Sequence, residues 1–407
     1  MPPIRFVHTG DEHIDNDTHG GLNPATGRNR AWESNAACLR AIAQRAADEK
    51  VDAFVHAGDA TKHGRPTIEA LLMYADAVAP VVEAGIPVVL LGGNHQLLQV
   101  PSSHRTATAA LGRLLAQRGA DVHVFERTPE LLRLNNGLQI GCIPWLSKTW
   151  VLGHLGKTDL DPAAGDQAVV DFAVATAARM CEEADPSSPL ILASHMTVTD
   201  VRIDGPTAGH RRGSEVDLTS LFAEPVIPRH ELEALPFSYI GLSHIHTRQR
   251  IGMKLFYAGA PNRFTFTDAG DPKSANLVTI GDDNTLLTVD HIATPARHLV
   301  NVDLTTPNYQ DALNTLTPDS IARIVLAPGD RVPPEHVTAA VTASRAMLAE
   351  VKVTPVPQLR RTVAVLPEKV DPQAGLVKWL DTRTTPTTLP VADVLAAAAQ
   401  LVEDASA

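Results

Sequence analysis

The stretch Leu90-Leu91-Gly92-Gly93-Asn94-His95-Gln96 decides the fold class of this chain, because it joins a buried strand to a polar loop. The apolar run that leads into it begins at Ile86 and has the composition of a buried strand. Two glycines then allow a sharp turn. Asn94 and His95 follow at the carboxyl end of the strand, which is where open α/β sheets bind ligands. Gly-Asn is also a common turn pair, so a functional loop here requires matching partners elsewhere.

The first hundred residues alternate apolar strands with segments of helical periodicity. Each predicted strand is short and apolar, and each predicted helix places its apolar residues three or four positions apart. Such an alternation is typical of βαβ units around a parallel sheet. The strands are expected over residues 4–9, 53–57 and 86–91, and the helices over 34–49 and 67–83.

The next two hundred residues continue this pattern and then change it. Helices are expected over 106–118 and 166–183, and strands over 122–125, 138–143, 190–193 and 237–242. Three shorter strands follow, over 254–257, 276–280 and 286–291. We expect these three strands to form a meandering sheet that covers the core from the other side.

The composition changes again near Thr294-Pro295, which suggests a domain boundary. Residues 296–366 show a compact βαβαβ-like pattern, with helices over 309–316 and 335–350 and a last strand over 351–356. The sequence therefore predicts an α/β protein with a large first domain (1–295), a small second α+β domain (296–366), in the place of what the resemblance described below implies is a capping domain, and a C-terminal helical segment (367–407).

Composition limits the class of protein. Hydrophobic residues make up 44% of the 407 residues, which is enough for buried cores and excludes a mostly disordered chain. The net charge of −11 argues against a surface built for non-specific nucleic-acid binding, although it allows a local basic groove. The three cysteines form no Cys-x-x-Cys pair and indicate neither a disulfide framework nor a thiolate zinc site. No signal peptide or membrane-length apolar run is visible, so we expect a cytoplasmic protein without a membrane anchor.

Five polar clusters follow five of the predicted strands. Any one of them alone is unremarkable, because Gly-Asp is a routine turn and a single His after a strand is usually a satisfied or exposed side chain. All five together, each at the end of an apolar strand, indicate a metal site. The clusters are Asp11-x-His13, Gly58-Asp59, Gly93-Asn94-His95, His195 and His244-x-His246.

These residue types suit a pair of divalent ions. Two such ions can steady the attacking and leaving oxygens of a phosphoryl transfer, and a central carboxylate, Asp59, would bridge them. Mixed oxygen and imidazole ligands favour manganese, iron or zinc over magnesium. Asp11, His13 and His246 would complete the shell of one ion, and Asn94, His195 and His244 the shell of the other. His95 is left over, and we expect it to act on the phosphate and to protonate the leaving oxygen.

The order of these motifs resembles the calcineurin-like metallophosphoesterase family. Further stretches resemble the nuclease subunits of that family that process DNA double-strand breaks together with a coiled-coil ABC-type ATPase. These stretches are residues 195–198, 213–218, 239–246 and 257–264. The likeness covers residues 1 to about 290, and the later segments match those nucleases in position and size alone.

This resemblance implies that residues 1–295 form a β-sandwich core flanked by helices and act as a manganese-dependent DNA nuclease. Such enzymes cut duplex ends exonucleolytically and single strands or hairpins endonucleolytically. The C-terminal segment would dock on the ATPase, and a homodimer is a further implied partner. Asn262 and Arg263 lie within a resembling motif, and we expect them to contact DNA phosphates.

The sequence differs from the family pattern at two positions. The family has Asp after Gly-Asn-His, where this chain has Gln96, which would leave His95 less basic. Ser243 replaces the usual Gly before His-x-His, with little expected effect. Two other functions remain open: a phosphoesterase for nucleotides or other small phosphoesters, and a non-catalytic adaptor for the ATPase. Gln96 is the one feature that favours the adaptor.

Overall fold

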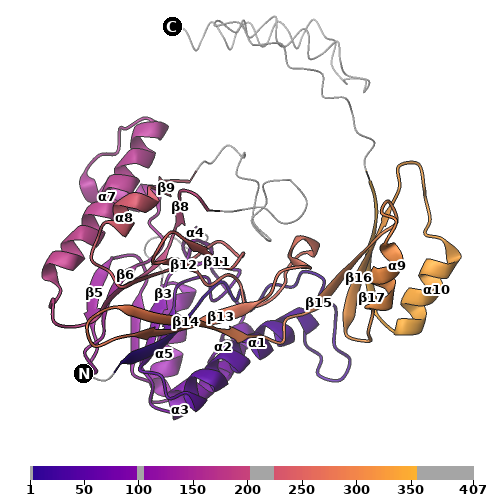
Figure 1. The fold of residues 1–407 in the computed structure, drawn as a ribbon, viewed down its shortest axis with the longest axis horizontal. Coiled ribbons are helices and arrows are strands. Elements are labelled where there is room, and N and C mark those ends of the chain that lie inside the picture. The colour runs from indigo at the N-terminus through magenta and orange to yellow at the C-terminus, as the bar shows by residue number, and fades with distance from the viewer. Residues whose placement is uncertain (1–2, 99–104, 202–223, 355–407) are drawn as a thin grey trace, which may run out of the picture. The chain divides into compact units, whose positions relative to one another are not determined.

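The computed structural model describes residues 3–98, 105–201 and 224–354, and within them two six-stranded sheets (Figure 1). In the first sheet, four strands run parallel and two antiparallel strands extend one edge. Its order is β14 (Leu286–Ala293), β13 (Ser274–Ile280), β1 (Ile4–Thr9), β2 (Ala53–His56), β3 (Val88–Leu91) and β4 (Val122–Phe125). The parallel core expected from the first hundred residues is present.

The second sheet is mixed as well. Its order is β11 (Gln249–Ile251), β12 (Leu255–Tyr257), β10 (Tyr239–Ser243), β7 (Leu190–His195), β6 (Gln139–Ile143) and β5 (Glu130–Arg133). Strands β6, β7, β10 and β12 are parallel, and the edge strands β5 and β11 are antiparallel to their neighbours. The short pair β8 (Thr197–Val198) and β9 (Val226–Ile227) lies outside both large sheets.

Alternating side chains of each strand face opposite ways, and both faces of the central strands are buried, whereas the edge strands β5 and β14 are partly exposed. In β1, Phe6 points into the layer between the two sheets, where it meets Tyr239 of β10 edge to face at 5.5 Å between ring centroids. The next residue, Val7, points to the other face and packs with Leu39 of a covering helix. The chain is therefore a β-sandwich with helices on both outer faces, as the sequence predicted.

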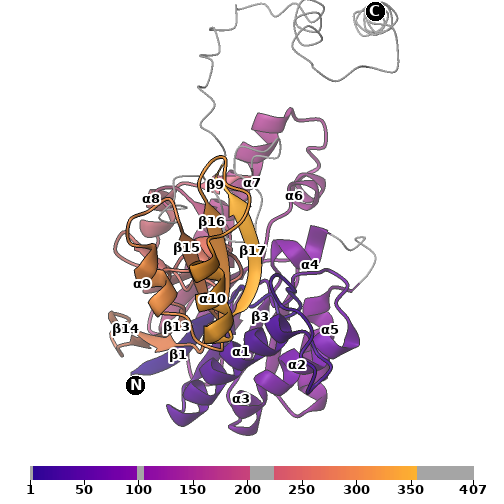
Figure 2. The same ribbon diagram turned by 90° about the vertical axis from the view of Figure 1, so that its right-hand side faces the viewer.

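The helices that cover the first sheet are α1 (Arg30–Asp48), α2 (Ile68–Ala77), α3 (Ala79–Glu83) and α5 (Ala107–Gln117). Those that cover the second are α6 (Lys148–Leu155), α7 (Pro162–Glu183) and α8 (Arg229–Glu233) (Figures 1 and 2). The single helix expected over 67–83 is wrong: the chain forms α2 and α3, because Pro80 at the start of α3 cannot donate to the preceding turn.

The meander expected over 254–291 is also wrong. Strand β12 belongs to the second sheet, whereas β13 and β14 extend the first, with β13 antiparallel to β1. The apolar pattern of these strands identifies them as strands, but it does not say which sheet edge they join. That choice depends on contacts far apart in sequence, such as those of Phe6 with Val278.

A third sheet contains β15 (His298–Asp303), β16 (Ser320–Leu326) and β17 (Met347–Val353), all parallel. The connecting helices α9 (Tyr309–Asn314) and α10 (Glu335–Ser344) pack on this sheet around Val302, Ile324 and Val337 (Figure 2). The βαβαβ order matches the sequence prediction. The last strand starts four residues earlier than expected, because Arg345 adopts φ 60° and ends α10.

Buried contacts join this sheet to the sandwich. Phe266, in the 3-10 turn η1 (Phe266–Asp268), packs with Leu299 and Ile321 of the third sheet. The guanidinium of Arg323 lies 4.6 Å from the centroid of the Phe266 ring. The predicted boundaries at 296 and 366 stay predictions, since residues 355–407, with the expected C-terminal helices, lie outside the described residues.

Candidate metal centre

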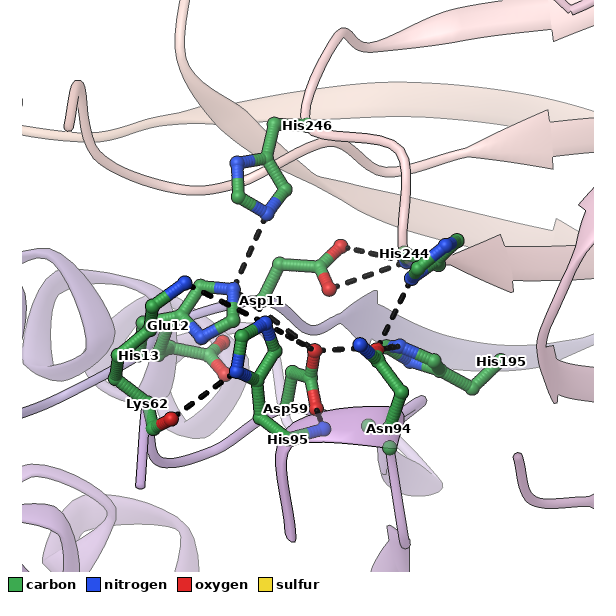
Figure 3. A network of polar contacts seen from close by, with 12 residues as sticks. Asp11, Glu12, His13, Asp59, Lys62, Asn94, His95, His195, His244 and His246 are labelled. Atoms are coloured by element: carbon green, nitrogen blue, oxygen red, sulfur yellow. Dashed lines mark hydrogen bonds and ion pairs between the residues drawn. The ribbon is translucent and has the colours of Figure 1, made fainter. Parts of the chain in front are cut away.

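The seven predicted metal ligands come from the carboxyl ends of strands in both large sheets. Asp11 and His13 follow β1, Asp59 follows β2, and Asn94 opens the short helix α4 (Asn94–Leu98) after β3. From the second sheet, His195 ends β7, and His244 and His246 follow β10. The structure brings all seven side chains together at the seam between the sheets, with Asp59 near the middle of the cluster (Figure 3).

The cluster divides into two sets of potential ligand atoms. In the first, one ligand atom each of Asp11, His13 and His246 lie within 4.8 Å of one another. The Nε2 atoms of His13 and His246 are 3.1 Å apart, so both rings point at the same position. This geometry would let one ion replace the contact between the two imidazoles.

The second set has Asp59, His195 and His244 within the same 4.8 Å limit. Asn94 Oδ1 lies 3.0 Å from His195 Nε2 and 3.1 Å from His244 Nδ1. Asp59 Oδ2 is 3.3 Å from His195 Nε2 in this set and 3.9 Å from His13 Nε2 in the other. The Asp59 carboxylate therefore lies between the two sets, where a bridging ligand is needed.

Burial supports an ion-binding role for the cluster. Each of the seven side chains is at most 6% exposed. Burying two carboxylates and four imidazoles costs free energy unless ions or hydrogen bonds compensate for the lost water. The donor set of carboxylate, amide and imidazole groups fits two divalent transition-metal ions.

The backbone at these loops is strained in a way that aims the side chains inward. Asp11, His13, Asp59 and His244 have φ values of 59°, 43°, 57° and 96°. Residues other than glycine rarely adopt this left-handed region, and such strain gathers at functional sites. The fold therefore holds four of the seven candidate ligands in a conformation that local sequence preference would not choose.

Two glycines leave the space that the cluster requires. A Cβ at Gly93 would lie 2.1 Å from Asp59 Oδ1, and a Cβ at Gly58 would lie 2.2 Å from His195 Nδ1. Gly58 also has φ 116°. The glycine turn of the opening motif thus allows the β3 loop to pass directly against the central carboxylate.

The imidazoles of the second set are oriented by hydrogen bonds on their far sides. His195 Nδ1 lies 2.9 Å from Ala57 O, and a carbonyl can only accept, so Nδ1 carries the proton and Nε2 faces the cluster. His244 Nε2 lies 3.1 Å from a carboxylate oxygen of Glu224, and its Nδ1 faces Asn94. Such outer partners commonly fix the tautomer of a metal-bound His. Sequence reasoning missed Glu224, because no motif marks a residue twenty positions before His244.

A second buried pair lies behind the cluster. Glu12, between two candidate ligands in sequence, turns away from them and pairs with His56 at the end of β2. Its other oxygen accepts from Thr9 Oγ1 at 2.8 Å. Both Glu12 and His56 are fully buried. This pair links the loop after β1 to the loop after β2, and only its place inside the Asp-x-His motif could have drawn attention to Glu12.

His95 lies beside the cluster with its ring held at both nitrogens. Its Nδ1 is 3.1 Å from Lys62 O and its Nε2 is 3.4 Å from Lys62 Nζ, while its backbone N–H donates to Asp59 Oδ1 at 3.1 Å (Figure 3). Because Lys62 O can only accept, the Nδ1 atom carries the proton, and Nε2 faces the candidate ligands. Its side chain is 14% exposed, so a substrate can reach it.

Gln96 links two loops beside the cluster. Its Oε1 accepts from Gly93 N at 2.9 Å, and its Nε2 donates to Thr61 O at 2.6 Å. The side chain is fully buried and ties the glycine turn to the loop that follows Asp59. The effect of Gln96 on the basicity of His95 stays a prediction.

The buried carboxylates and imidazoles of the cluster affect one another's protonation. Burial raises the pKa of Asp11 to about 7, although the charge of His195 opposes this. Burial would also raise the pKa of Asp59, but the nearby His195, His95 and His13 outweigh it and hold that pKa well below its ordinary value. Burial would lower the pKa of His195, but the charge of Asp59 raises it to about 9. Protons thus occupy the cluster when ions do not.

The two residues predicted to contact DNA, Asn262 and Arg263, form hydrogen bonds to other parts of the chain. Asn262 is fully buried and donates to Asn35 Oδ1 at 2.7 Å, so it does not reach a DNA backbone in this structure. Arg263 donates to Arg297 O at 2.8 Å and to Asp271 O at 2.8 Å. These bonds use most of the Arg263 donors within the protein, and a DNA contact by Arg263 stays a prediction. Residues 213–218 of the resembling stretches lie outside the described residues.

The chain is similar in sequence to bacterial nuclease subunits. It is 24% identical over 302 residues to the SbcD subunit of the SbcCD nuclease of Escherichia coli strain K12, covering 72% of this chain and 68% of that protein. The same protein of Escherichia coli O157:H7 gives the same values. A dimetal phosphatase structure from Danio rerio aligns with a TM-score of 0.38 and 13% identity, over 72% of this chain and 100% of that one.

A comparison with known protein families covers all seven candidate ligands. The sequence pattern of the calcineurin-like phosphoesterases matches residues 4–247, which is more than half of the chain and spans Asp11 to His246. Two sheets that present carboxylate, amide and imidazole groups at one seam are what a metal-dependent hydrolase of phosphoesters needs. The chain belongs to the calcineurin-like phosphoesterase family.

Proposed function

We propose that this chain is a DNA nuclease that hydrolyses phosphodiester bonds with two divalent ions, most readily manganese. The proposal is supported by the family and by the likeness to the SbcD subunit of the SbcCD nuclease. The observation that carries it is the buried cluster of seven candidate ligands with His95 beside it. Iron or zinc would also suit these ligands.

The ligand roles follow from the two sets. Asp11, His13 and His246 would hold one ion; Asn94, His195 and His244 would hold the other; and Asp59 would bridge them. When bound, the ion pair neutralises the phosphate and supplies a water nucleophile that is active near neutral pH.

His95 then acts on the leaving side of the phosphoryl group. Its Nδ1–H is fixed by Lys62 O, so the ring can turn only its Nε2 toward the substrate. A protonated Nε2 would donate to the leaving sugar oxygen as the bond to phosphorus breaks. The backbone bond from His95 to Asp59 keeps the ring at a constant distance from the bridging carboxylate.

The wider role is proposed from the bacterial relative named above. We propose exonuclease action on duplex ends and endonuclease action on single strands and hairpins, in the cytoplasm, with an SbcC-like coiled-coil ATPase and a second copy of the chain as partners. Within the described residues, the longest helices are too polar or too short to span a bilayer.

The test is digestion of end-labelled linear DNA by the full chain in manganese, compared with hydrolysis of bis(4-nitrophenyl) phosphate at equal enzyme. Release of labelled nucleotides that stops when the metal is chelated supports the nuclease. Fast turnover of the small diester with intact DNA would instead assign the chain to small phosphoesters. No turnover of either substrate would favour the adaptor.

We predict that His95→Ala retains both ions and loses DNA cleavage, by about 10²- to 10⁴-fold, because a general acid contributes that much to the rate. Manganese stoichiometry and cleavage are measured on the same preparation. The exposed His154→Ala is the matched control and should cleave like the parent. Cleavage by His95→Ala at the parent rate would remove His95 from the mechanism.

A further inference from the structure

We propose that Lys62 contacts the substrate, with its ammonium group binding a non-bridging oxygen of the phosphoryl group under attack. The inference rests on the proposed phosphodiesterase function and adds a residue to that site. Lys62 stands three residues after Asp59, in the loop that follows β2, and its side chain is partly exposed.

The backbone of this loop is held from three directions. Lys62 N donates to Asp15 Oδ1 at 2.5 Å, and Thr61 O accepts from Gln96 at 2.6 Å. Lys62 O accepts from His95 Nδ1 at 3.1 Å. The backbone of Lys62 therefore fixes the loop and holds His95 at Nδ1, while the ammonium group contacts the same ring at Nε2.

The ammonium group lies where a bound phosphate is expected. Lys62 Nζ is 3.4 Å from His95 Nε2, and that nitrogen is 4.0 Å from Asp59 Oδ2 (Figure 3). A phosphoryl group that meets both His95 and an ion pair bridged by Asp59 must lie within a few Å of Lys62. The two side chains would then approach the same phosphate from neighbouring directions.

The charge of Lys62 suits an anionic ligand. Two divalent ions would outweigh the charges of Asp11 and Asp59, so a further cation beside them is unfavourable until an anion binds. Lysine is a compact point charge and a common phosphate binder. During attack on phosphorus, charge increases on the non-bridging oxygens, and a donor fixed beside them lowers the barrier.

The test uses the full chain with manganese and three variants: Lys62→Gln, Lys62→Arg and Arg65→Gln. Arg65 is an exposed cation three residues further along the same loop, so its variant makes the same change in net charge at an exposed position. Three quantities are measured for each protein: manganese affinity, affinity for inorganic phosphate by calorimetry, and kcat/KM for bis(4-nitrophenyl) phosphate.

Lys62→Gln should bind manganese at least as tightly as the parent, bind inorganic phosphate roughly tenfold more weakly, and lose about 10²-fold in kcat/KM. Lys62→Arg should recover most of the phosphate affinity, and Arg65→Gln should match the parent. Unchanged phosphate affinity in Lys62→Gln, weaker manganese binding, or an equal loss in Arg65→Gln would overturn the inference.

The experiment distinguishes a failure of the Lys62 inference from a failure of the proposed function. If the parent hydrolyses phosphodiesters and Lys62→Gln does so equally well, only the role of Lys62 is lost. If the manganese-loaded parent neither binds phosphate nor cleaves any phosphodiester, the proposed function is lost with it.

Discussion

The residues around the candidate centre differ in how well their roles could be predicted from the sequence. The seven candidate ligands could be named in advance, because each follows an apolar strand and each carries a donor that transition metals accept. Glu224 and Lys62 could not, since their importance comes from what the fold places beside them. Gln96 could be named as a departure from the family pattern, but its hydrogen bonds to Gly93 and Thr61, which tie two loops together, could not be foreseen.

Glu224 is the residue whose loss tests how His244 is oriented. In Glu224→Gln the side-chain amide can donate its N–H to His244 Nε2. The variant then no longer favours the tautomer in which Nε2 carries the proton and the lone pair of Nδ1 is available to an ion. We expect manganese affinity to fall about 10- to 100-fold, as for other outer partners of metal-bound His. Calorimetric titration with manganese measures the effect, and the exposed Glu182→Gln serves as the control. Equal affinity in both variants would deny Glu224 this role.

The pH dependence of metal loading follows from the charges in the metal-free cluster. His195 has a pKa raised to about 9 by Asp59, so at pH 7 it is protonated and cannot bind an ion. Asp11, whose pKa is raised to about 7 by burial, is partly protonated there. Metal binding must displace these protons, so affinity should rise with pH from 6 to 9, by roughly tenfold per unit for each proton released.

Proton release is measured by titrating manganese in two buffers of different ionisation enthalpy at pH 7. A heat that differs between the buffers reports the protons displaced. An affinity that stays flat between pH 6 and pH 8 would contradict the proposed protonation of His195 and Asp11.

At the scale of elements, the strands that carry ligands were the most predictable parts of the fold. Strands β1, β2, β3, β7 and β10 are rich in apolar residues and almost fully buried, because both faces of these central strands are covered. The edge strands β5 and β11 were missed, since they are short and partly exposed. The sheet assignment of β12 to β14 failed for a different reason: strand pairing over long separations leaves no local signal.

The glycine turn between β3 and α4 provides the test at this scale. Gly93→Ala places a methyl group against the Asp59 carboxylate and backbone, neither of which can move without disturbing the centre. We expect the variant to fold but to bind manganese at least about tenfold more weakly, which corresponds to roughly 1.4 kcal/mol. Gly153→Ala is the control, because a Cβ there meets open space. Parent-like metal binding by Gly93→Ala would show that the turn relaxes.

For the whole molecule, the two sheets share the candidate centre, and neither supplies both ligand sets. Bound ions would therefore connect the loops of one sheet to those of the other. Any ligand that binds only the folded state raises its stability, by about 2.7 kcal/mol per site at a hundred times the dissociation constant. The family and the β-sandwich were predictable at this scale, whereas the joining of the third sheet through Phe266 was not.

Manganese should accordingly raise the midpoint of thermal unfolding, by on the order of 5 °C for two sites in a chain of this size. Differential scanning calorimetry with manganese and with a chelator measures the shift. The exposed His154→Gln should show the full shift, and His195→Gln should show a smaller one. A midpoint that does not respond to the metal would argue against ions joining the two sheets.

The division of the centre between the two sheets also bears on how the protein is made. Asp11, His13, Asp59 and Asn94 leave the ribosome early, whereas His195, His244 and His246 are added about a hundred or more residues later. Until the second sheet has been synthesised and folded onto the first, each candidate set lacks imidazoles: the first lacks His246, and the second lacks His195 and His244. A stalled or truncated nascent chain that ends before His195 would thus lack part of both candidate ligand sets, and we expect such a fragment to have no hydrolytic activity.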